Sequence, residues 1–447
     1  MSKVIVIGDV MLDQYTYGDV IRISPEAPIP VLKQTSNEFK LGGAANVAAN
    51  LRALNVEVYL FSASGTDAAA YGIDTLLEKV YIDNYIVKAV ELTTPHKHRF
   101  VSNNHQILRV DTEEKFFINN YTQSRLYNLL SQKIKDCEVL IISDYNKGLI
   151  TENFALSLME LARANNIKVL VDTKKTDIKC FSGAYLITPN EAEGSKIAST
   201  SALDEIAGFC SEYVENILIT RGDKGMYLWD GFNTYNVKAL ANKLVDVSGA
   251  GDTVLAVMAQ GVLNKIPLHK TMRVANLAAS IVVSKFGTSV CTKEELNHAI
   301  QRGELKHYNE TELVSLIKEW KKDGLVIGFI NGSFNLLHKG HLHLIKTAKQ
   351  QCNKLIVAIN SDDYLLTYKN IQAFPNRAVN VAVIPYVDAV IVFTESTPKN
   401  LISILKPNIH FTGDDYSISD IKKVSNVKIV QIPRITVDIS STQIYSI

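Results

Sequence analysis

The chain has 447 residues, which is more than a single ordinary core accommodates and therefore predicts two domains. Apolar residues make up 47% and charged residues 21%, the balance of a globular protein. With 47 Lys and Arg against 46 Asp and Glu, the net charge of +1 gives no reason to expect binding to nucleic acid or to a membrane surface.

The cysteines and the N-terminus indicate the compartment. The five cysteines are far apart in the sequence and form no C-x-x-C pair, which argues against a disulfide framework or a zinc cluster and favours a reducing compartment. The chain opens on the short apolar run Val4–Ile7, ended by Gly8, which does not resemble a signal peptide. No long uninterrupted apolar stretch suggests a membrane span. We therefore expect a cytoplasmic protein.

Short β-branched runs alternate with helical patterns from end to end, which is typical of parallel α/β sheets. The runs are Val4–Ile7, Val56–Phe61, Val139–Ile142, Val169–Val171, Ile217–Thr220, Leu325–Ile330, Leu355–Ile359, Ala389–Phe393 and Val427–Ile432. Two segments break the alternation, the proline-rich Asp19–Gln34 and the polar–apolar Tyr85–Val110. We expect antiparallel strands there, at one edge of the sheet, as a lid over a site.

The domain boundary is expected near residues 303–324. Arg302–Thr311 is polar and unpatterned, whereas Glu312–Lys322 has helical spacing and ends at Asp323-Gly324, a signal for a helix C-terminus. We predict a first domain over residues 1–303, a linker and helix over residues 304–324, and a second domain over residues 325–447.

The segment D-V-S-G-A-G-D-T at positions 246–253 precedes an apolar helical run. Its small residues Gly249, Ala250 and Gly251 would let backbone N–H groups at a helix N-terminus approach a transferring phosphoryl group. Asp252, beside them, is placed to take the proton from an attacking hydroxyl. Taken alone, the segment is explained about as well by a helix N-cap with a glycine turn.

A second helix also opens with consecutive glycines, Gly42 and Gly43. A neutral substrate could lie against this bare backbone, with hydrogen bonds from Asn46. Asp9 and Asp13 follow the first strand, at the edge where α/β sheets usually build a site. A cap for Asp9 and a solvated loop charge for Asp13 are the plainer explanations.

The order G-G-x-x-N and then D-x-x-G-A-G-D resembles the two signatures of the ribokinase, or phosphofructokinase-B-type, sugar kinases, over residues 1–300. The resemblance implies a Rossmann-like α/β sandwich with a small β lid, Asp252 as catalytic base, and residues 249–251 as the anion hole. The nucleotide-side residues that it implies are Asn190 and Glu193, which match an N-x-x-E motif linked to Mg²⁺ and phosphate, and Thr220, Gly222, Gly225, Asn276 and Gly287. A turn and helix start after Pro189 is the plainer explanation of the N-x-x-E motif.

A second constellation follows the strand that ends at position 330. His338 and His341, three residues apart at the start of an amphipathic helix, share a face, and Gly340 between them leaves room for a phosphate chain. Two imidazoles, helix-end N–H groups and Lys339 or Lys346 could stabilise the charge on an α-phosphate during in-line attack. A core histidine, or a metal pair completed by His343, is the alternative, but no further ligand stands at helical spacing.

This strand–glycine–H-x-G-H–helix order resembles the H-x-G-H cytidylyltransferase-like family over residues 325–447, and it implies a smaller nucleotidyltransferase α/β domain. The nucleotide-binding residues that the resemblance implies are Gly332, Ser333, Phe334, Lys346, Asn360, Asp362, Ser440, Ser441 and Thr442. Taken alone, residues 440–442 would more often be a helix N-cap.

The pairing of the two domains resembles the bifunctional heptose-7-phosphate kinase and heptose-1-phosphate adenylyltransferases of ADP-heptose and lipopolysaccharide synthesis. This resemblance extends along the chain in short sequence segments, at Gly8–Asp13, Arg22–Pro28 and Ser143–Gly148. It implies phosphorylation of heptose 7-phosphate at O1 by ATP with Mg²⁺, removal of the 7-phosphate by a separate phosphatase, and adenylyl transfer from ATP to heptose 1-phosphate. It also implies a homodimer.

A substrate that already carries a phosphate needs cations, and basic residues lie on the predicted lid strands. The expected sugar-binding residues are Asp13, Gly42, Gly43, Asn46, Lys97, Arg99 and Arg109. For the three basic residues, a solvated strand face is nearly as good an explanation.

The second domain departs from its family pattern at three places. Asn335 replaces the usual Asp before H-x-G-H, the loop at residues 365–377 lacks the usual Lys-Gly…Arg-Pro stretch, and Asp414 replaces a glycine. The alternatives are therefore another sugar phosphate, CTP or GTP as the nucleotide, or an active kinase with a degenerate C-terminal binding module.

Overall fold

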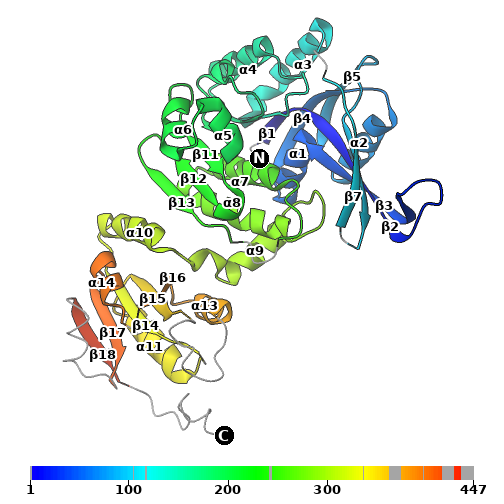
Figure 1. The fold of residues 1–447 in the computed structure, drawn as a ribbon. Coiled ribbons are helices and arrows are strands. Elements are labelled where there is room, and N and C mark those ends of the chain that lie inside the picture. Colours follow the sequence, from blue (N-terminus) through cyan, green and yellow to red (C-terminus); the bar gives the residue numbers. More distant parts are fainter. Residues whose placement is uncertain are drawn as a thin grey trace. The chain divides into compact units, whose positions relative to one another are not determined.

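The computed structural model describes residues 3–103, 105–115, 118–240, 244–335, 337–361, 374–395, 397–414 and 427–433. The chain forms two compact units, Met1–Leu296 and Asn297–Ile447 (Figure 1). Within the described ranges, no helix is both long enough and apolar enough to cross a bilayer.

The first unit is built on a central sheet to which nine of its described strands belong. In spatial order they are β13 (Thr234–Val237), β12 (Met226–Trp229), β11 (Ile217–Thr220), β10 (Leu186–Ile187), β9 (Lys168–Thr173), β8 (Cys137–Asp144), β1 (Lys3–Gly8), β4 (Glu57–Ser64) and β5 (Asp83–Lys88). The strands from β11 to β5 pair in parallel, and β12 and β13 close one edge antiparallel. The apolar run Val4–Ile7 is fully buried because both faces of the sheet are covered.

Helices cover the two faces of this sheet. They are α1 (Ala44–Ala53), α2 (Ala68–Lys79), α3 (Asn120–Lys133), α4 (Glu152–Ala164), α5 (Glu191–Ala198), α6 (Leu203–Cys210), α7 (Ala250–Leu263) and α8 (Leu268–Val283). A further helix, α9 (Lys293–Gln301), spans the boundary between the two units. Helices α3 to α6 share one apolar core with the sheet, and α1, α7 and α8 pack together on the other face (Figure 1). The unit is therefore an α/β/α sandwich, as predicted.

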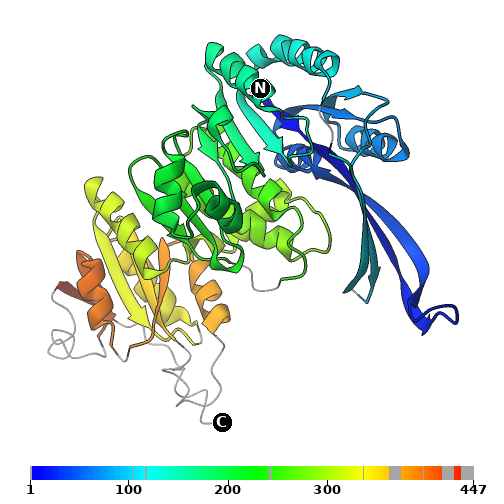
Figure 2. The ribbon, with the colours of Figure 1, turned by 45° about the horizontal axis from the view of Figure 1, so that its top comes forward.

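A second, four-stranded sheet forms the lid. Its order is β3 (Pro30–Gly43), β2 (Val10–Ile23), β6 (His96–Ser102) and β7 (His105–Thr112), and Figure 2 shows its strands projecting beyond the sandwich. The predicted lid differs in two details. Tyr85 lies on β5 of the central sheet, and β6 pairs with β2 in parallel, because β6 returns to the lid through a crossover and not through a hairpin.

Strand β1 lies between β4 and β8, and the strand order runs outward from it in opposite directions. The β1–β8 border is therefore the switch point of this sheet, beyond whose carboxyl ends α/β proteins bind ligands. Asp9 follows β1 and Tyr145 follows β8, so both lie at this point.

The second unit has a parallel sheet, whose described strands are, in spatial order, β16 (Ala389–Phe393), β15 (Lys354–Asn360), β14 (Ile327–Gly332), β17 (Ile409–Gly413) and β18 (Lys428–Ile432). Its described helices are α10 (Glu310–Lys322), α11 (Lys339–Lys349), α13 (Phe374–Ala382) and α14 (Lys399–Leu405). Leu313, Ile317 and Trp320 of α10 are buried in one of its cores. The helix assigned to the linker thus packs on this sheet, while the three domain bounds stay a prediction.

Two local features complete the fold. Asn55, just after α1, has φ 62°, a left-handed conformation that Asn tolerates. The five cysteines are free, and all except the partly buried Cys352 are buried. Burial raises the thiol pKa to about 12 for Cys137 and Cys291, and to about 11 for Cys180, Cys210 and Cys352.

Two candidate active sites

Asp252 lies in the first turn of α7 and is 4% exposed. One carboxylate oxygen accepts a hydrogen bond from Asn46 Nδ2 at 2.7 Å, and the other accepts one from the Tyr145 hydroxyl at 2.8 Å. Burial raises the pKa of Asp252 to about 6, against the opposing effect of these two hydrogen bonds. A carboxylate in this state can accept a proton near neutral pH.

Two glycines allow close approaches around Asp252. Gly249 is the N-cap of α7 with φ 79°, and a Cβ there would lie 2.7 Å from Asn46 Nδ2. At Gly42 a Cβ would lie 2.8 Å from a carboxylate oxygen of Asp13. Both glycine motifs are therefore packed directly against the polar side chains that the sequence singled out, although they are far apart in the chain.

Asp13 is buried on β2 and lies at the centre of the residues expected on the sugar side, called here the sugar-side cluster. Arg99 donates to one oxygen of Asp13 at 2.6 Å, and the Thr288 hydroxyl donates to the other at 2.7 Å. The β2–β6 register places Asp13 opposite Lys97. Arg99 is thus an internal partner of Asp13, and Arg109 pairs with Asp111 at 2.9 Å on exposed β7.

Truncating Arg99 to Ala is expected to destabilise the first unit by about 3–5 kcal/mol, because it leaves the Asp13 charge buried without its cation. Arg109→Ala is the matched control, because its ion pair is half-exposed and worth about 0–1 kcal/mol. Calorimetric unfolding of both variants measures the difference. If both variants lost the same unfolding free energy, the buried Arg99–Asp13 pair would contribute no more to stability than the exposed pair.

The nucleotide-side residues gather at the carboxyl ends of β10 and β11. Asn190 caps α5 in a capping box with Glu193, and its backbone bridges to Thr220. Glu193 also pairs with Lys174 at 2.6 Å. Gly222 and Gly225 follow in the turn after β11, both at positive φ.

Two other residues expected on the nucleotide side, Asn276 and Gly287, lie elsewhere in the first unit and have partners of their own. Asn276 is buried on α8 and donates from Nδ2 to the Lys238 carbonyl at 2.7 Å. Gly287 donates its N–H to Asp246 at 3.0 Å, and its α-carbon faces the Tyr15 ring of the lid. Gly287 therefore lies beside the sugar-side cluster, because the next residue, Thr288, is bonded to Asp13.

The sequence reasoning missed three residues near Asp252. Tyr145 donates a hydrogen bond to Asp252. Lys174 and Asp172, at the carboxyl end of β9, interact with it electrostatically. Burial raises the pKa of Asp172 to about 7. A signal existed for each, because all three stand at the carboxyl ends of predicted parallel strands, where side chains converge.

The second site is the loop between β14 and α11. His338 is the N-cap of α11, and its Nδ1 accepts the Gly340 N–H at 3.1 Å, which places the neutral ring proton on Nε2. The His338 and His341 rings stack with centroids 3.9 Å apart. Phe334 is 2% exposed, takes φ 46° and packs on His341 at 5.1 Å. The predicted histidine pair therefore shares one face.

Arg377 of α13 ties this loop to the neighbouring strand. It is completely buried and donates to the carbonyls of Ser333 at 2.7 Å and Asn360 at 2.8 Å. Gly332 ends β14 against the Phe334 ring, whereas Lys346 is exposed on α11. The expected residues that lie outside the described ranges are Asp362, Ser440, Ser441 and Thr442.

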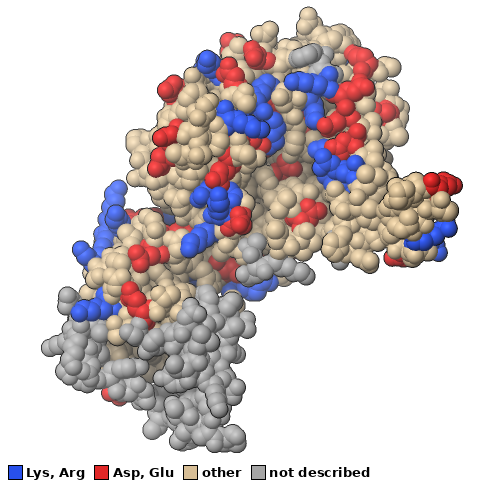
Figure 3. All heavy atoms as spheres, viewed as in Figure 1, with Lys and Arg blue, Asp and Glu red and all other residues tan. Residues whose placement is uncertain are grey.

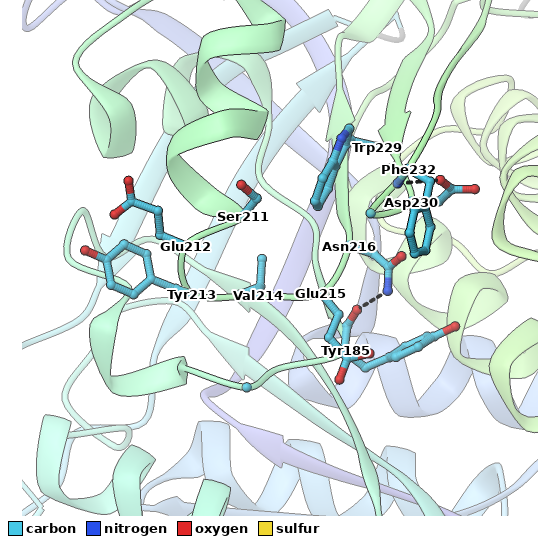
Figure 4. Close-up of a pocket in the computed structure, with 12 residues that line it drawn as sticks. Tyr185, Ser211, Glu212, Tyr213, Val214, Glu215, Asn216, Trp229, Asp230 and Phe232 are labelled. Atoms are coloured by element: carbon cyan, nitrogen blue, oxygen red, sulfur yellow. Dashed lines mark hydrogen bonds between the residues drawn. The ribbon is translucent and has the colours of Figure 1, made fainter.

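A hollow of about 620 Å³ lies in the first unit away from Asp252, at the amino ends of β10 and β11 (Figure 4). Tyr185, Trp229 and Phe232 line it. The switch point, with Asp252 and its partners, is at the opposite, carboxyl ends of the strands. Its position therefore excludes this hollow from the site around Asp252.

Comparisons with known proteins assign a family to each of the two units. The family model described as pfkB family carbohydrate kinase matches residues 1–295, and the model described as Cytidylyltransferase-like matches residues 329–446. The "Bifunctional protein HldE" of Granulibacter bethesdensis is 37% identical over 445 residues, covering 94% of this chain and 92% of that protein. The chain belongs to the HldE family. Haemophilus influenzae HldE is also 37% identical, over 94% of this chain and 90% of the relative.

The family assignment confirms the predicted pairing of a sugar kinase with a nucleotidyltransferase in one enzyme. Solved structures show the same fold for the kinase part of this HldE-family chain. Escherichia coli phosphofructokinase-2 with potassium aligns with a TM-score of 0.58 at 19% identity, covering 67% of this chain and 98% of that one. Arabidopsis thaliana ribokinase with ribose and ATP aligns at 0.53 and 18%, with the same coverage.

Proposed function

We propose that the first unit transfers the γ-phosphate of ATP to O1 of D-glycero-D-manno-heptose 7-phosphate. The second unit then transfers AMP from ATP to heptose 1-phosphate, after a phosphatase has removed the 7-phosphate. The observation that carries the first activity is Asp252, an ionisable carboxylate held between the sugar-side residue Asn46 and the N-terminus of α7.

In the kinase reaction, Asp252 takes the proton of the O1 hydroxyl while O1 bonds to the γ-phosphorus and the bond to the ADP oxygen breaks. Gly249, Ala250 and Gly251 form the anion hole, because the α7 N-terminus favours negative charge there. Asn46 orients the carboxylate, and Lys97 faces the sugar phosphate from the lid.

Mg²⁺ fits the kinase unit as an ion that arrives with ATP. In the described part of the chain no three His, Cys, Asp or Glu side chains are grouped to cage a metal. Glu193 offers a hard carboxylate oxygen at the nucleotide-side edge, which suits Mg²⁺ held by one protein ligand, phosphates and water. The ion would neutralise charge on the phosphates, and Lys174 beside Glu193 adds a second cation there.

Kinase activity is expected to fall on the acid side of pH 6. Burial raises the pKa of Asp252 to about 6, and the base works only as the carboxylate, so kcat/KM should drop about tenfold per pH unit below that value. Initial rates from pH 5 to 9 at saturating ATP measure this. A profile flat down to pH 5 would show that another group takes the proton.

In the second unit, a phosphate oxygen of heptose 1-phosphate attacks the α-phosphorus of ATP, and pyrophosphate leaves. His338 and His341, stacked at the N-terminus of α11, stabilise the charge on the α-phosphate. Arg377 holds the carbonyls of Ser333 and Asn360, and so fixes the loop that carries the histidines.

Product analysis tests both activities. The full chain is incubated with heptose 7-phosphate or heptose 1-phosphate and with ATP, CTP or GTP, and the products are resolved by mass spectrometry. We expect heptose 1,7-bisphosphate with ATP in the first case, and ADP-heptose with pyrophosphate in the second. Bisphosphate without any nucleotide sugar would leave the kinase with a C-terminal binding module.

We also propose that the chain is a homodimer formed through the lid. Apolar side chains stand exposed on its strands, among them Ile21 at 70%, Ile23 at 60% and Leu108 at 54%. Figure 3 shows that the visible face of the lid carries few charged side chains. A patch of this kind on a sheet with open edge strands suits a symmetric interface.

Sedimentation of Ile21→Lys and Leu108→Lys variants tests this interface. Both are expected to shift a dimer toward the monomer, whereas Phe232→Lys, an exposed aromatic outside the lid, should leave it unchanged. A wild-type monomer at micromolar concentration would refute the proposal.

We place the chain in the cytoplasm, because its five free cysteines suit a reducing compartment.

A further inference from the structure

Tyr145 stands at the switch point of the central sheet, in the turn after β8. Its hydroxyl donates to a carboxylate oxygen of Asp252 at 2.8 Å, across 107 residues of chain. Asn46 donates to the other oxygen at 2.7 Å. Each oxygen of the carboxylate therefore has its own donor, and the two hydrogen bonds together restrict the rotation of the group.

Two buried carboxylates build the turn that carries Tyr145. Asp9 accepts the backbone N–H groups of Tyr145 at 2.9 Å and Lys147 at 3.3 Å, and Asp144 accepts that of Asn146 at 2.8 Å. Asn146 takes φ 57°, the left-handed conformation that the turn requires. Because the backbone is fixed at three N–H groups, the ring has little freedom to move away from Asp252.

Charged groups surround this pair on every side. The ammonium groups of Lys174 and Lys97 lie 5.5 Å and 6.0 Å from the centre of the Tyr145 ring. The carboxylates of Asp13 on β2 and Asp172 on β9 also act on Asp252. A lysine of the lid and a lysine that follows β9 thus both lie near the ring, whose hydroxyl points at Asp252.

We propose that Tyr145 is a positioning residue of the kinase reaction, whose hydroxyl fixes the Asp252 carboxylate in the orientation that receives the sugar proton. This proposal rests on the proposed kinase function. A hydrogen bond to the charged form of an acid lowers its pKa, and Tyr145 acts on Asp252 in this direction. Without the hydroxyl, Asp252 should hold its proton to higher pH and be less well oriented.

Tyr145→Phe is the test, because it removes the hydroxyl and keeps the ring beside the two lysines. We expect kcat for sugar phosphorylation to fall about tenfold or more, the scale of one charge-assisted hydrogen bond, with KM for ATP unchanged. The acid limb of the kcat/KM profile should move to higher pH. A purely structural role would lower the amount of active enzyme without moving that limb.

Tyr227→Phe is the matched control. Tyr227 is buried and likewise donates to a carboxylate, Asp204, at 2.6 Å, but it lies on β12 and has no contact with Asp252 among the described hydrogen bonds. Its variant should keep the wild-type kcat and pH profile. If Tyr145→Phe lowers the melting temperature, the acid limb still decides, since its position does not depend on the amount of folded protein.

The outcomes separate the two proposals. A wild-type profile in Tyr145→Phe, with an active parent enzyme, overturns the positioning role and leaves the kinase function standing. A parent that phosphorylates no heptose 7-phosphate overturns the proposed function, and the positioning role with it. A shifted acid limb in Tyr145→Phe and not in Tyr227→Phe supports both.

Discussion

Asp252→Asn is expected to lower ATP-dependent sugar phosphorylation by about 10²–10⁴-fold, the contribution of a positioned general base. Asparagine matches aspartate in size but cannot take the proton of the attacking hydroxyl. Burial already disfavours the charged form of Asp252, so the variant should be at least as stable as the parent. Coupled-enzyme assay of ADP release and calorimetry measure the two effects.

Asp204→Asn is the control for this change, because Asp204 likewise accepts a hydrogen bond from a buried tyrosine and lies outside the site. It should keep full kinase activity. Nucleotidyl transfer should persist in both variants, because the base belongs to the first unit. Loss of both activities from a folded Asp252→Asn protein would contradict the assignment of two separate sites.

His341→Ala is expected to lower nucleotidyl transfer by about 10²–10³-fold, the cost of removing one preorganised donor from a developing phosphate charge. The imidazole stacks on His338 and packs on Phe334, so its loss also loosens the loop that would hold the triphosphate. Pyrophosphate release from ATP and heptose 1-phosphate measures the effect, and kinase activity should be retained.

His343→Ala tests whether position on the helix matters. His343 lies two residues further along α11, which turns it away from the face that His338 and His341 share. Its variant should keep nucleotidyl transfer. Equal losses in the two variants would point to a general effect on α11, and retained transfer in His341→Ala would remove the histidine pair from the mechanism.

The strands and the glycine-lined helix starts could be predicted because their signals are local. Val4–Ile7 is apolar throughout because both faces are covered, and the H-x-G-H loop needs only one strand and one helix. The meeting of Asn46 with Asp252 could be inferred only by resemblance, because the two residues are 206 apart in sequence.

The remaining site residues depend on register and on convergence of loops. Arg99 has the pattern of a lid cation, but the parallel β2–β6 register brings it onto Asp13. Tyr145 and Lys174 meet Asp252 only because three chain segments end at one edge of the sheet. Arg377 ends the loop that lacks the family motif, and its hydrogen bonds to the Ser333 and Asn360 carbonyls depend on how α13 packs against the strand ends, which no local pattern shows.

The cysteine thiols, buried in the first unit and partly buried in the second, give each unit its own reporter of opening. A thiol with a pKa near 11 or 12 is almost entirely protonated at pH 8, so an alkylating reagent modifies it faster once the surrounding structure opens. Cys352 lies in the second unit and the other four lie in the first. Peptide mapping after timed alkylation would therefore reveal which unit opens locally first as the temperature rises, without any engineered label.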